Sequence, residues 1–432
     1  MIIFFDQALP LLAEVLRECG EDLKKIGPMV VNRDLAGRIR LVVHEQVQDN
    51  QEARAILEGI SRILAEKLGP HGVSADRMVL FEPSLDAVKQ GASHFQLQDL
   101  DGVTVVDRLA TDTDWANIAP ISVGPPRLVF FSIKGGVGRS TALAVAAWSL
   151  AQVGKRVLVL DLDLESPGLS SSLLPSDRRP AHGITDWLVE DLVDNGADIF
   201  QDMVGTSDLA RDGEIFVVPA HGGKPGEYVA KLGRVWMSKM HGDGSREPWS
   251  RRLNRLLGEL EAQWRPDVVL IDSRAGIDEV ASACVTDLGA ANVLMFALDG
   301  EQTWSGYGIL FRHWNQTGVV REIRERLQVV GSMIPEVNGA EYFEGLRVGA
   351  WEAFMDALYD AVPPGEPAGD RFSYDEPDAA APHFPWPIYW HRGFAALYSL
   401  YSRLPQIDEG RSREVFGVFL EGVHALVEGR TA

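Results

Sequence analysis

The residues best placed to do chemistry form the segment Lys134-Gly-Gly-Val-Gly-Arg-Ser-Thr141, which follows an apolar run from Arg127 to Ile133. The three glycines allow backbone angles and a close approach to oxygen that a Cβ would prevent. Such a loop directs successive backbone N–H groups at one anion, and the helix that begins near Ser140 adds its unpaired amides and positive dipole end. We therefore expect a phosphate-binding loop in which Ser140 can offer its hydroxyl to Mg²⁺.

The flanks of this loop have the pattern of a strand–loop–helix–strand unit. Residues Ala142 to Gln152 form a helical run that Gly154 can end, and Arg156 to Leu162 read as a buried parallel strand. A glycine turn that only joins a strand to a helix is the alternative. The flanks weigh against it, because together they make a βαβ unit of the expected length.

Acidic residues follow two of the predicted strands. Asp161 and Asp163 come at the end of the strand after the helix, and Asp272 closes the apolar run that begins at Pro266. Ligands of open parallel sheets bind at the carboxyl ends of the strands, so these acids should converge with the loop on one crevice. Two acids that merely end a strand in solvent are the alternative, and it has more weight for Asp161 than for Asp163.

The loop resembles that of the ParA/MinD family of dimeric ATPases, whose deviant Walker A pattern is K-G-G-x-G-K-[ST]. The segment from Lys134 to Thr141 fits this pattern except that Arg139 replaces the second lysine. The resemblance implies ATP and Mg²⁺ as cofactors. It implies nucleotide binding by Gly135, Gly136, Val137, Gly138, Arg139, Ser140, Thr141 and Gly276.

The same resemblance implies roles for single side chains. Lys134 would reach across a dimer interface to the partner's nucleotide, and Asp163 would orient the attacking water. Arg139 joins them as a catalytic candidate, although a planar guanidinium is not equivalent to an ammonium and puts hydrolysis in doubt. The implied residues at the magnesium site are Ser140, Asp161 and Asp272.

The residues after Asp272 resemble a switch that senses the γ-phosphate. In Ser273-Arg-Ala-Gly276 the Gly276 amide would lie near that phosphate. Arg274 departs from the family's usual pattern. It either supplies positive charge to the transition state or pairs with an acid at the surface, and the second interpretation is preferred.

The predicted fold class is α/β, with a mostly parallel sheet flanked by helices as in ParA/MinD P-loop NTPases. A smaller α/β or α+β domain of unknown role precedes it. The expected boundaries are residues 1–118 for the N-terminal domain, 119–126 for a linker and 127–432 for the ATPase domain. The last domain should include a C-terminal helical extension and a loop or disordered linker near 363–386.

The last predicted helix, Arg413 to Glu428, has one apolar side and an acidic one. In MinD a terminal amphipathic helix inserts into membrane with a basic polar face. An acidic face would be repelled by anionic lipid, so packing against the core is the preferred interpretation and no membrane partner is expected.

Composition limits the partners. The net charge is −21, the pI is near 4.9 and no large basic cluster stands out, which disfavours nucleic acid, although a local basic face on a dimer stays open. Cys19 and Cys284 make no disulfide framework or metal motif, and no long uncharged run occurs. These features favour a cytoplasmic protein.

Two functional hypotheses follow. The first is a Mg²⁺-dependent ATPase that forms a homodimer when ATP is bound and is coupled through its N-terminal domain to an unknown protein partner. The second is a nucleotide-dependent binding scaffold or sensor that hydrolyses ATP poorly because of Arg139, in a regulatory or defence system.

Overall fold

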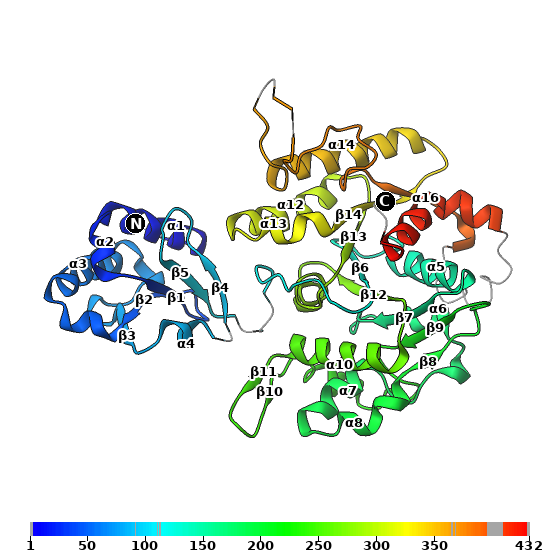
Figure 1. The fold of residues 1–432 in the computed structure, drawn as a ribbon, viewed down its shortest axis with the longest axis horizontal. Helices are drawn as coiled ribbons and strands as arrows, with labels where there is room; N and C mark the ends of the chain where they lie inside the picture. Colours follow the sequence, from blue (N-terminus) through cyan, green and yellow to red (C-terminus); the bar gives the residue numbers. More distant parts are fainter. Residues whose placement is uncertain are drawn as a thin grey trace. The chain divides into compact units, whose positions relative to one another are not determined.

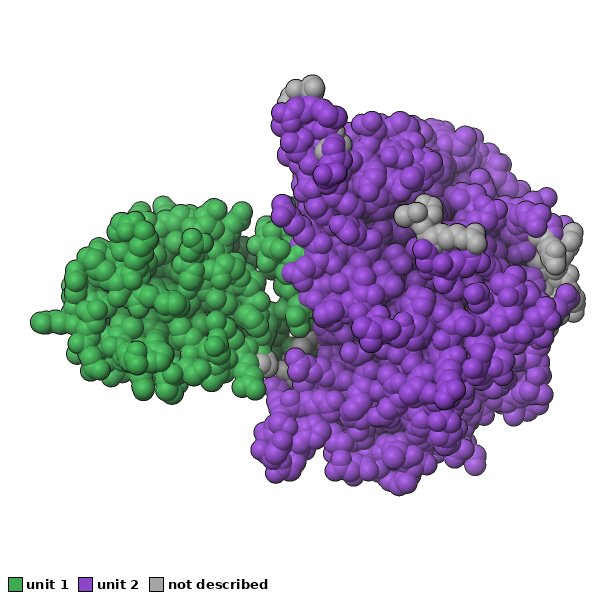
Figure 2. Space-filling model, in the orientation of Figure 1, with its two compact units in different colours: residues 1–117, 313–319 green, residues 118–312, 320–432 purple. Residues whose placement is uncertain are grey.

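The chain folds into two compact units, residues 1–117 with 313–319 and residues 118–312 with 320–432 (Figure 2). The computed structural model describes residues 3–90, 92–109, 111, 114–363, 366–367, 369–394 and 409–429. Each unit has its own sheet and its own buried core.

The N-terminal unit is built on a mixed sheet with the order β3-β2-β1-β5-β4 (Figure 1). The β1–β5 and β2–β3 pairs are parallel, and the β1–β2 and β4–β5 pairs are antiparallel. The strands are β1 (Met29–Arg33), β2 (Ile39–His44), β3 (Val79–Glu82), β4 (Ser93–Gln96) and β5 (Val103–Asp107). The helices are α1 (Phe5–Cys19), α2 (Asp22–Ile26), α3 (Gln51–Lys67) and α4 (Leu85–Lys89). The prediction of a smaller mixed domain before the loop is confirmed.

Alternation along these strands gives the N-terminal sheet two apolar faces. Val31 and Val105 lie in the larger core with residues of α1 and α3. Val30 and Val106 lie in a smaller cluster on the other face, against residues of α4. Successive side chains of a strand point to opposite faces, so the sheet is covered on both sides.

The second unit contains a sheet with the order β15-β14-β13-β6-β12-β7-β9-β8 (Figure 1). Among the described residues, the β8–β9 pair is antiparallel and the other pairs of this sheet are parallel. The strands are β6 (Arg127–Ser132), β7 (Arg156–Asp161), β8 (Gly205–Thr206), β9 (Glu214–Val218), β12 (Val268–Ala275), β13 (Asn292–Ala297), β14 (Leu327–Ile334) and β15 (Trp386–Tyr389). This confirms the predicted fold class.

Helices flank this sheet on both faces, and a separate small hairpin pairs β10 (Lys239–Met240) with β11 (Arg246–Glu247). The longer helices are α5 (Arg139–Gln152), α10 (Trp249–Trp264), α12 (Glu301–Gln316), α14 (Gly339–Ala357) and α16 (Glu409–Val427). The shorter helices are α6 (Ser170–Leu173), α7 (Ile184–Glu190), α8 (Gly196–Ile199), α9 (Tyr228–Leu232), α11 (Glu279–Ser282) and α13 (Val320–Ile323).

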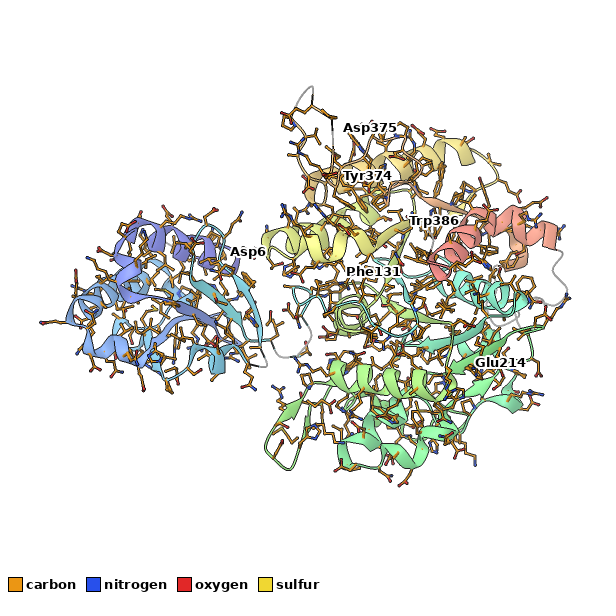
Figure 3. The ribbon with its side chains drawn as sticks, viewed as in Figure 1. Asp6, Phe131, Glu214, Tyr374, Asp375 and Trp386 are labelled. Atoms are coloured by element: carbon orange, nitrogen blue, oxygen red, sulfur yellow. The ribbon has the colours of Figure 1, made fainter. Side chains whose placement is uncertain are left out.

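The central strand β6 shows how the two helical layers attach. Phe130 packs against Phe419 of α16, with 6.3 Å between the ring centroids. Its neighbour Phe131, labelled in Figure 3, packs against Tyr307 of α12 at 6.0 Å. Because the two side chains point to opposite faces, β6 is buried on both sides, as its continuous apolar sequence predicts.

The C-terminal helix packs into the core, as expected. Phe416, Phe419 and Val423 of α16 belong to the same buried cluster as α5. Trp386 of β15 lies against α16 (Figure 3), at Gly422, where a Cβ would come within 2.6 Å of the indole ring. The apolar side of α16 is therefore buried inside the protein.

The segment expected to be a loop or disordered linker near 363–386 is a packed loop where the structure describes it. The rings of Phe372 and Tyr374 contact Tyr359, at centroid distances of 5.5 and 5.6 Å. The segment ends in the edge strand β15, which the sequence analysis missed. The many prolines and glycines of this segment predict a loop, but its aromatic side chains pack against Tyr359 and hold the loop in place.

Asp191 organises a buried ionic network beside the β10–β11 hairpin. Its carboxylate binds Lys239 at 3.0 Å, Arg252 at 2.8 Å and Arg255 at 3.0 Å, and its side chain is 6% exposed. Burial by itself would raise the pKa of Asp191, but the three cations outweigh it and hold the pKa below its ordinary value. The charged carboxylate therefore stabilises the fold above the unfolded pKa, and this contribution is lost as the pH falls through the folded pKa.

Replacing Asp191 with asparagine should lower the free energy of unfolding at neutral pH by about 1–3 kcal/mol, because buried cations lose their counter-charge. The variant should also lose less stability than the native protein below about pH 4. Urea unfolding at several pH values measures both effects. Asp208→Asn, which breaks the exposed pair with Arg178, is the control and should cost less than about 1 kcal/mol. An identical acid limb in the native protein and Asp191→Asn would contradict this role.

Candidate functional site

The glycine-rich loop leaves β6 and enters α5 with its backbone open to solvent. Gly136 and Gly138 have φ values of 74° and 79°, in the left-handed region that favours glycine, and Gly138 is the N-cap of α5. A Cβ on Gly135 or Gly136 would meet nothing within 4 Å. The fold itself therefore gives Gly135 no steric reason to be glycine, and the open space above it leaves room for a ligand to approach the backbone.

Arg139 is turned inward and lies among acidic residues. Its Nε donates to Asp272 Oδ1 at 2.8 Å, and one terminal nitrogen donates to Ser132 Oγ at 3.1 Å. The other terminal nitrogen lies 3.6 Å from Asp163 Oδ2. The side chain is 7% exposed. The guanidinium thus links the first residue of α5 to the ends of β6, β7 and β12.

Asp272 accepts hydrogen bonds on both carboxylate oxygens. Arg139 occupies Oδ1, and Ser140 Oγ donates to Oδ2 at 2.6 Å. The carboxylate is 1% exposed, so two donors compensate its burial. This contact brings together the hydroxyl and the acid that were both expected at a magnesium site.

Asp161 is fully buried, so the alternative interpretation, an acid that ends a strand in solvent, is wrong. Its Oδ2 accepts a hydrogen bond from the Ser170 amide at 3.4 Å, whereas Oδ1 has no hydrogen-bond partner among the described residues. Burial, with repulsion from Asp272, raises the pKa of Asp161 to about 8. A buried carboxyl oxygen without a protein partner needs another one, such as water, an ion or a ligand.

Asp163 lies nearer to the surface, with 19% of its side chain exposed. Its Oδ1 accepts a hydrogen bond from the Ser166 amide at 3.2 Å. Partial burial raises the pKa of Asp163, and the positive charge of Arg139 opposes that rise. The carboxylate is thus fixed beside the loop and still reachable by water.

The predicted switch segment, Ser273 to Gly276, makes hydrogen bonds and ion pairs with other parts of the protein. The Gly276 amide donates to the Ser132 carbonyl at 2.9 Å, and Gly276 has a φ of 104°. Arg274 pairs with Glu165 at 2.5 Å and with Asp278 at 3.3 Å. The preferred interpretation of Arg274, a pair with surface acids, is the one seen.

The remaining loop residues divide into exposed and buried positions. Lys134 is exposed and makes no hydrogen bond or ion pair with the residues that the structure describes. The Val137 side chain is 3% exposed and packs in the core, so only its backbone can meet a ligand. Thr141 is half-buried, on the first turn of α5.

These residues fit a nucleotide with Mg²⁺. The exposed backbone at Gly135 and Gly136 suits phosphate oxygens, and oxygen donors are what Mg²⁺ prefers. Ser140 and Asp272 would hold the metal, and Asp161 offers an unpaired oxygen beside them. No group of three or more histidine, cysteine, aspartate or glutamate side chains that could itself hold a metal occurs in the described part of the chain. Mg²⁺ usually combines one or two carboxylates with phosphate oxygens and water.

Two contributors to this site were not predicted. Ser132 contacts Arg139 and Gly276 through different atoms, and its position as a hydroxyl residue at the end of a buried strand was an available signal. Tyr228 of α9 donates to the Leu164 carbonyl at 2.6 Å and so holds the segment that carries Asp163. No local pattern marks Tyr228, because the contact joins residues far apart in the chain.

Parallel strands, a glycine-rich loop at the start of a helix and acids at the neighbouring strand ends define a P-loop nucleotide-binding domain. The family model of the CobQ/CobB/MinD/ParA nucleotide binding domain matches residues 128–350, just over half of the chain. The chain belongs to this family, as its resemblance to ParA/MinD ATPases predicted.

Individual relatives are more distant. A protein named as an arsenical pump-driving ATPase of Aquifex aeolicus (strain VF5) is 36% identical over 78 residues, which are 18% of this chain and 20% of that protein. The chain thus matches about a fifth of that relative's length.

Two solved structures show a similar arrangement at low identity. The MinC:MinD cell division complex of Aquifex aeolicus is 20% identical, with 54% of this chain and 77% of that chain covered and a TM-score of 0.35. A plasmid partition protein from Borrelia burgdorferi is 19% identical, with 52% and 86% covered and a TM-score of 0.36. The family assignment rests on the matched domain and not on these two structures.

None of the described helices is both long and apolar enough to cross a bilayer.

Proposed function

We propose that this protein is a Mg²⁺-dependent ATPase that acts as a nucleotide-controlled dimerisation switch. In this proposal its ATP-bound form is a homodimer in the cytoplasm, and its N-terminal unit couples the nucleotide state to a protein partner. Membership of the nucleotide-binding family supports the binding of a nucleotide. The site geometry supports the roles of Mg²⁺ and of hydrolysis, while dimerisation, location and coupling are further parts of the proposal.

One observation carries the proposal. Gly135 and Gly136 are exposed in the loop between β6 and α5, and Ser140, in the first turn of α5, donates a hydrogen bond to Asp272. The loop can bind phosphate oxygens, while the hydroxyl and carboxylate can hold a hydrated cation next to them. When bound, Mg²⁺ would neutralise charge that develops on the phosphates.

The protein's own residues have distinct roles in this proposal. Asp163 orients the water that attacks the terminal phosphate, because it is fixed by the Ser166 amide and stays accessible. The Arg139 guanidinium gives up its contacts with Asp272 and Asp163 and then neutralises charge on the phosphate. The Gly276 amide would sense the terminal phosphate by giving up its hydrogen bond to the Ser132 carbonyl and donating to the phosphate instead.

A second candidate function is a binding scaffold that holds ATP and hydrolyses it poorly. The contact of Arg139 with Asp163 at 3.6 Å favours this second function. For hydrolysis, Arg139 would have to bind the phosphate and also release Asp163, the acid proposed to orient the water. An ammonium could not make the three contacts that Arg139 makes. In this alternative the ATP-bound state itself is the signal.

Binding of a fluorescent ATP analogue and phosphate release by the purified full chain test these proposals. Binding that requires Mg²⁺, together with turnover, is expected for the ATPase. Binding without turnover would support the scaffold. Absence of nucleotide binding would overturn both.

Lys134→Ala should leave ATP binding within about threefold of the native value and weaken ATP-dependent dimerisation at least about tenfold, because its proposed contact is the other subunit's phosphate. Sedimentation velocity with a non-hydrolysable ATP analogue measures the dimer. Lys67→Ala, which removes an exposed lysine from α3, is the matched control. Equal dimerisation of Lys134→Ala and the control would remove the proposed role in the partner's site.

A further inference from the structure

The edge strand β3 of the N-terminal unit has backbone groups that its own sheet does not use. In the parallel β2–β3 pair, Val79 lies opposite Leu41 and Phe81 lies opposite Val43. The Leu41 amide donates to the Met78 carbonyl at 2.9 Å. A residue in a parallel ladder bonds to the two residues that flank its opposite neighbour, so the N–H and C=O groups of Val79 and Phe81 point away from the sheet.

This edge strand is short and ends at Glu82, which Pro83 follows, but its first three residues are apolar. No backbone hydrogen bond joins Val79 or Phe81 to an element outside the sheet among the described residues. Proteins usually protect such edges with charges, prolines or bulges. β3 has the sequence Val-Leu-Phe-Glu in an unbroken register, whereas the opposite edge, β4, reads Ser-His-Phe-Gln. An apolar, regular edge strand can accept another strand.

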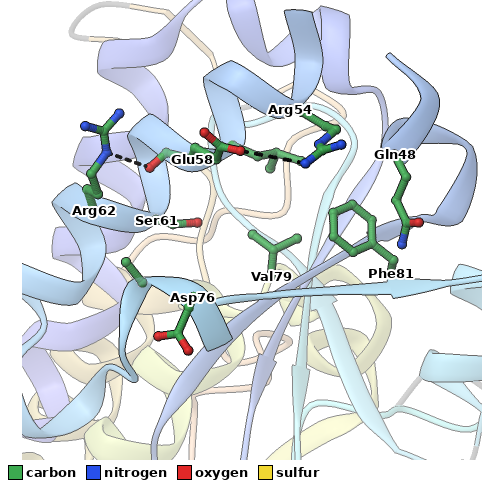
Figure 4. Close-up of a pocket in the computed structure, with 10 residues that line it drawn as sticks. Gln48, Arg54, Glu58, Ser61, Arg62, Asp76, Val79 and Phe81 are labelled. Atoms are coloured by element: carbon green, nitrogen blue, oxygen red, sulfur yellow. Dashed lines mark hydrogen bonds and ion pairs between the residues drawn. The ribbon is translucent and has the colours of Figure 1, made fainter. Parts of the chain in front are cut away.

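A hollow of about 480 Å³ lies along the same edge (Figure 4). Val79 and Phe81 contribute side chains to it, and Leu57 and Ser61 of α3 line it from the helix. In Figure 4 the Val79 and Phe81 side chains project from β3 into the space below α3. The residues with outward backbone groups therefore also provide an apolar floor beside that edge.

The rim of the hollow is charged and balanced. Arg54 and Arg62 are on α3, with Glu58 between them, and Asp76 lies at the other side. Arg54 is 4.0 Å from Glu58, and both side chains are more than half exposed. Two positive and two negative groups select for neither a polyanion nor a polycation. They are compatible with the mixed polar flanks of an ordinary protein segment.

The geometry points to a binding site for an extended peptide segment of a partner protein, which adds to β3 as a strand and places an apolar side chain in the hollow. Main-chain hydrogen bonds to Val79 and Phe81 provide affinity, and the hollow provides selectivity. A small molecule in the hollow would leave the outward backbone groups unused. The inference deepens the proposed coupling to a protein partner and rests on that proposed function.

The test uses the full chain and a phage-displayed library of random dodecapeptides. Selected peptides should share an apolar residue with alternating neighbours, and a synthetic copy should bind the native chain in fluorescence anisotropy. Phe81→Pro removes an outward N–H, and the residue before it, Leu80, lies inside the strand, where the extended backbone is compatible with a following proline. Phe81→Ala removes the same side chain and keeps the N–H. We expect Phe81→Pro to bind at least about tenfold more weakly than Phe81→Ala.

A second variant leaves the β3 backbone unchanged. Ala75→Trp places an indole in the hollow from its lining and should also weaken the peptide at least about tenfold. Circular dichroism and thermal unfolding check that both variants fold. Equal peptide affinity in Phe81→Pro, Phe81→Ala and Ala75→Trp would overturn the inference, as would a library that yields no binding peptide.

Two further measurements separate the other outcomes. Self-association of the native chain without nucleotide, lost in Phe81→Pro, would overturn the peptide assignment in favour of a second copy of the chain. Binding of the fluorescent ATP analogue should be the same in the native chain and the β3 variants. If no form binds that analogue, the proposed switch function fails whatever the peptide result.

Discussion

Asp163→Ala is expected to lower ATP turnover at least about a hundredfold, while ATP affinity changes by less than about threefold. Asp163 is the acid beside the loop that is both fixed, by the Ser166 amide, and reachable by water. Removal of the Asp163 carboxylate also relieves its repulsion of Asp272 and Asp161, so the free energy of unfolding should not fall. Phosphate release under saturating ATP measures turnover, and a fluorescent analogue measures binding.

Glu165→Gln is the matched control, because Glu165 is an acid of the same segment that pairs with Arg274. Its turnover should stay within about threefold of native. Native-like turnover in Asp163→Ala would show that another group orients the water. Parallel losses in both variants would mean that the conformation of the segment, and not the Asp163 carboxylate, governs turnover.

Arg139→Ala should have two large effects. It leaves Asp272, which is 1% exposed, without its counter-charge, so the free energy of unfolding without nucleotide should fall by about 3–5 kcal/mol. It also removes a charge-assisted contact to phosphate, so ATP should bind at least about tenfold more weakly. Urea unfolding and analogue binding measure the two effects. Arg156→Ala, which breaks a half-exposed pair with Glu214, should cost less than about 1 kcal/mol.

Arg139→Lys separates charge from shape at the same position. Lysine keeps the charge but cannot contact Asp272, Ser132 and Asp163 together, so Asp163 should be released for its proposed role. ATP binding should be retained and turnover should rise. Loss of turnover with retained binding would instead identify the guanidinium as a tuned part of catalysis. Unchanged stability in Arg139→Ala would show that its buried ion pairs contribute little to the fold.

Local sequence was enough to predict the framework of the second unit. The apolar runs before Lys134, Asp161 and Asp272 became β6, β7 and β12, and the glycine-rich loop begins α5 as expected. Buried parallel strands need continuous apolar sequence, and a phosphate loop needs glycine at left-handed positions, so both are visible in the residues. The site roles themselves stay predictions until the variants are measured.

Weaker local signals explain what was missed. The strands β1, β4 and β15 are short, and β15 follows a segment rich in proline and glycine. Pairing with neighbouring strands, more than local preference, makes such residues extended. The hollow beside β3 likewise depends on how α3 is placed over the edge strand, which no spacing in the sequence reveals.

The sequence by itself determined that strands, loop and acids would occur in this order and meet at the carboxyl ends of a parallel sheet. Only the tertiary structure decided which residues the charged groups contact. Arg139 meets Asp272, a residue 133 positions away, and Asp161 is buried with one oxygen unpaired. These choices depend on burial and on distances between strand ends, because a charge removed from water must find the opposite charge that packing brings within reach.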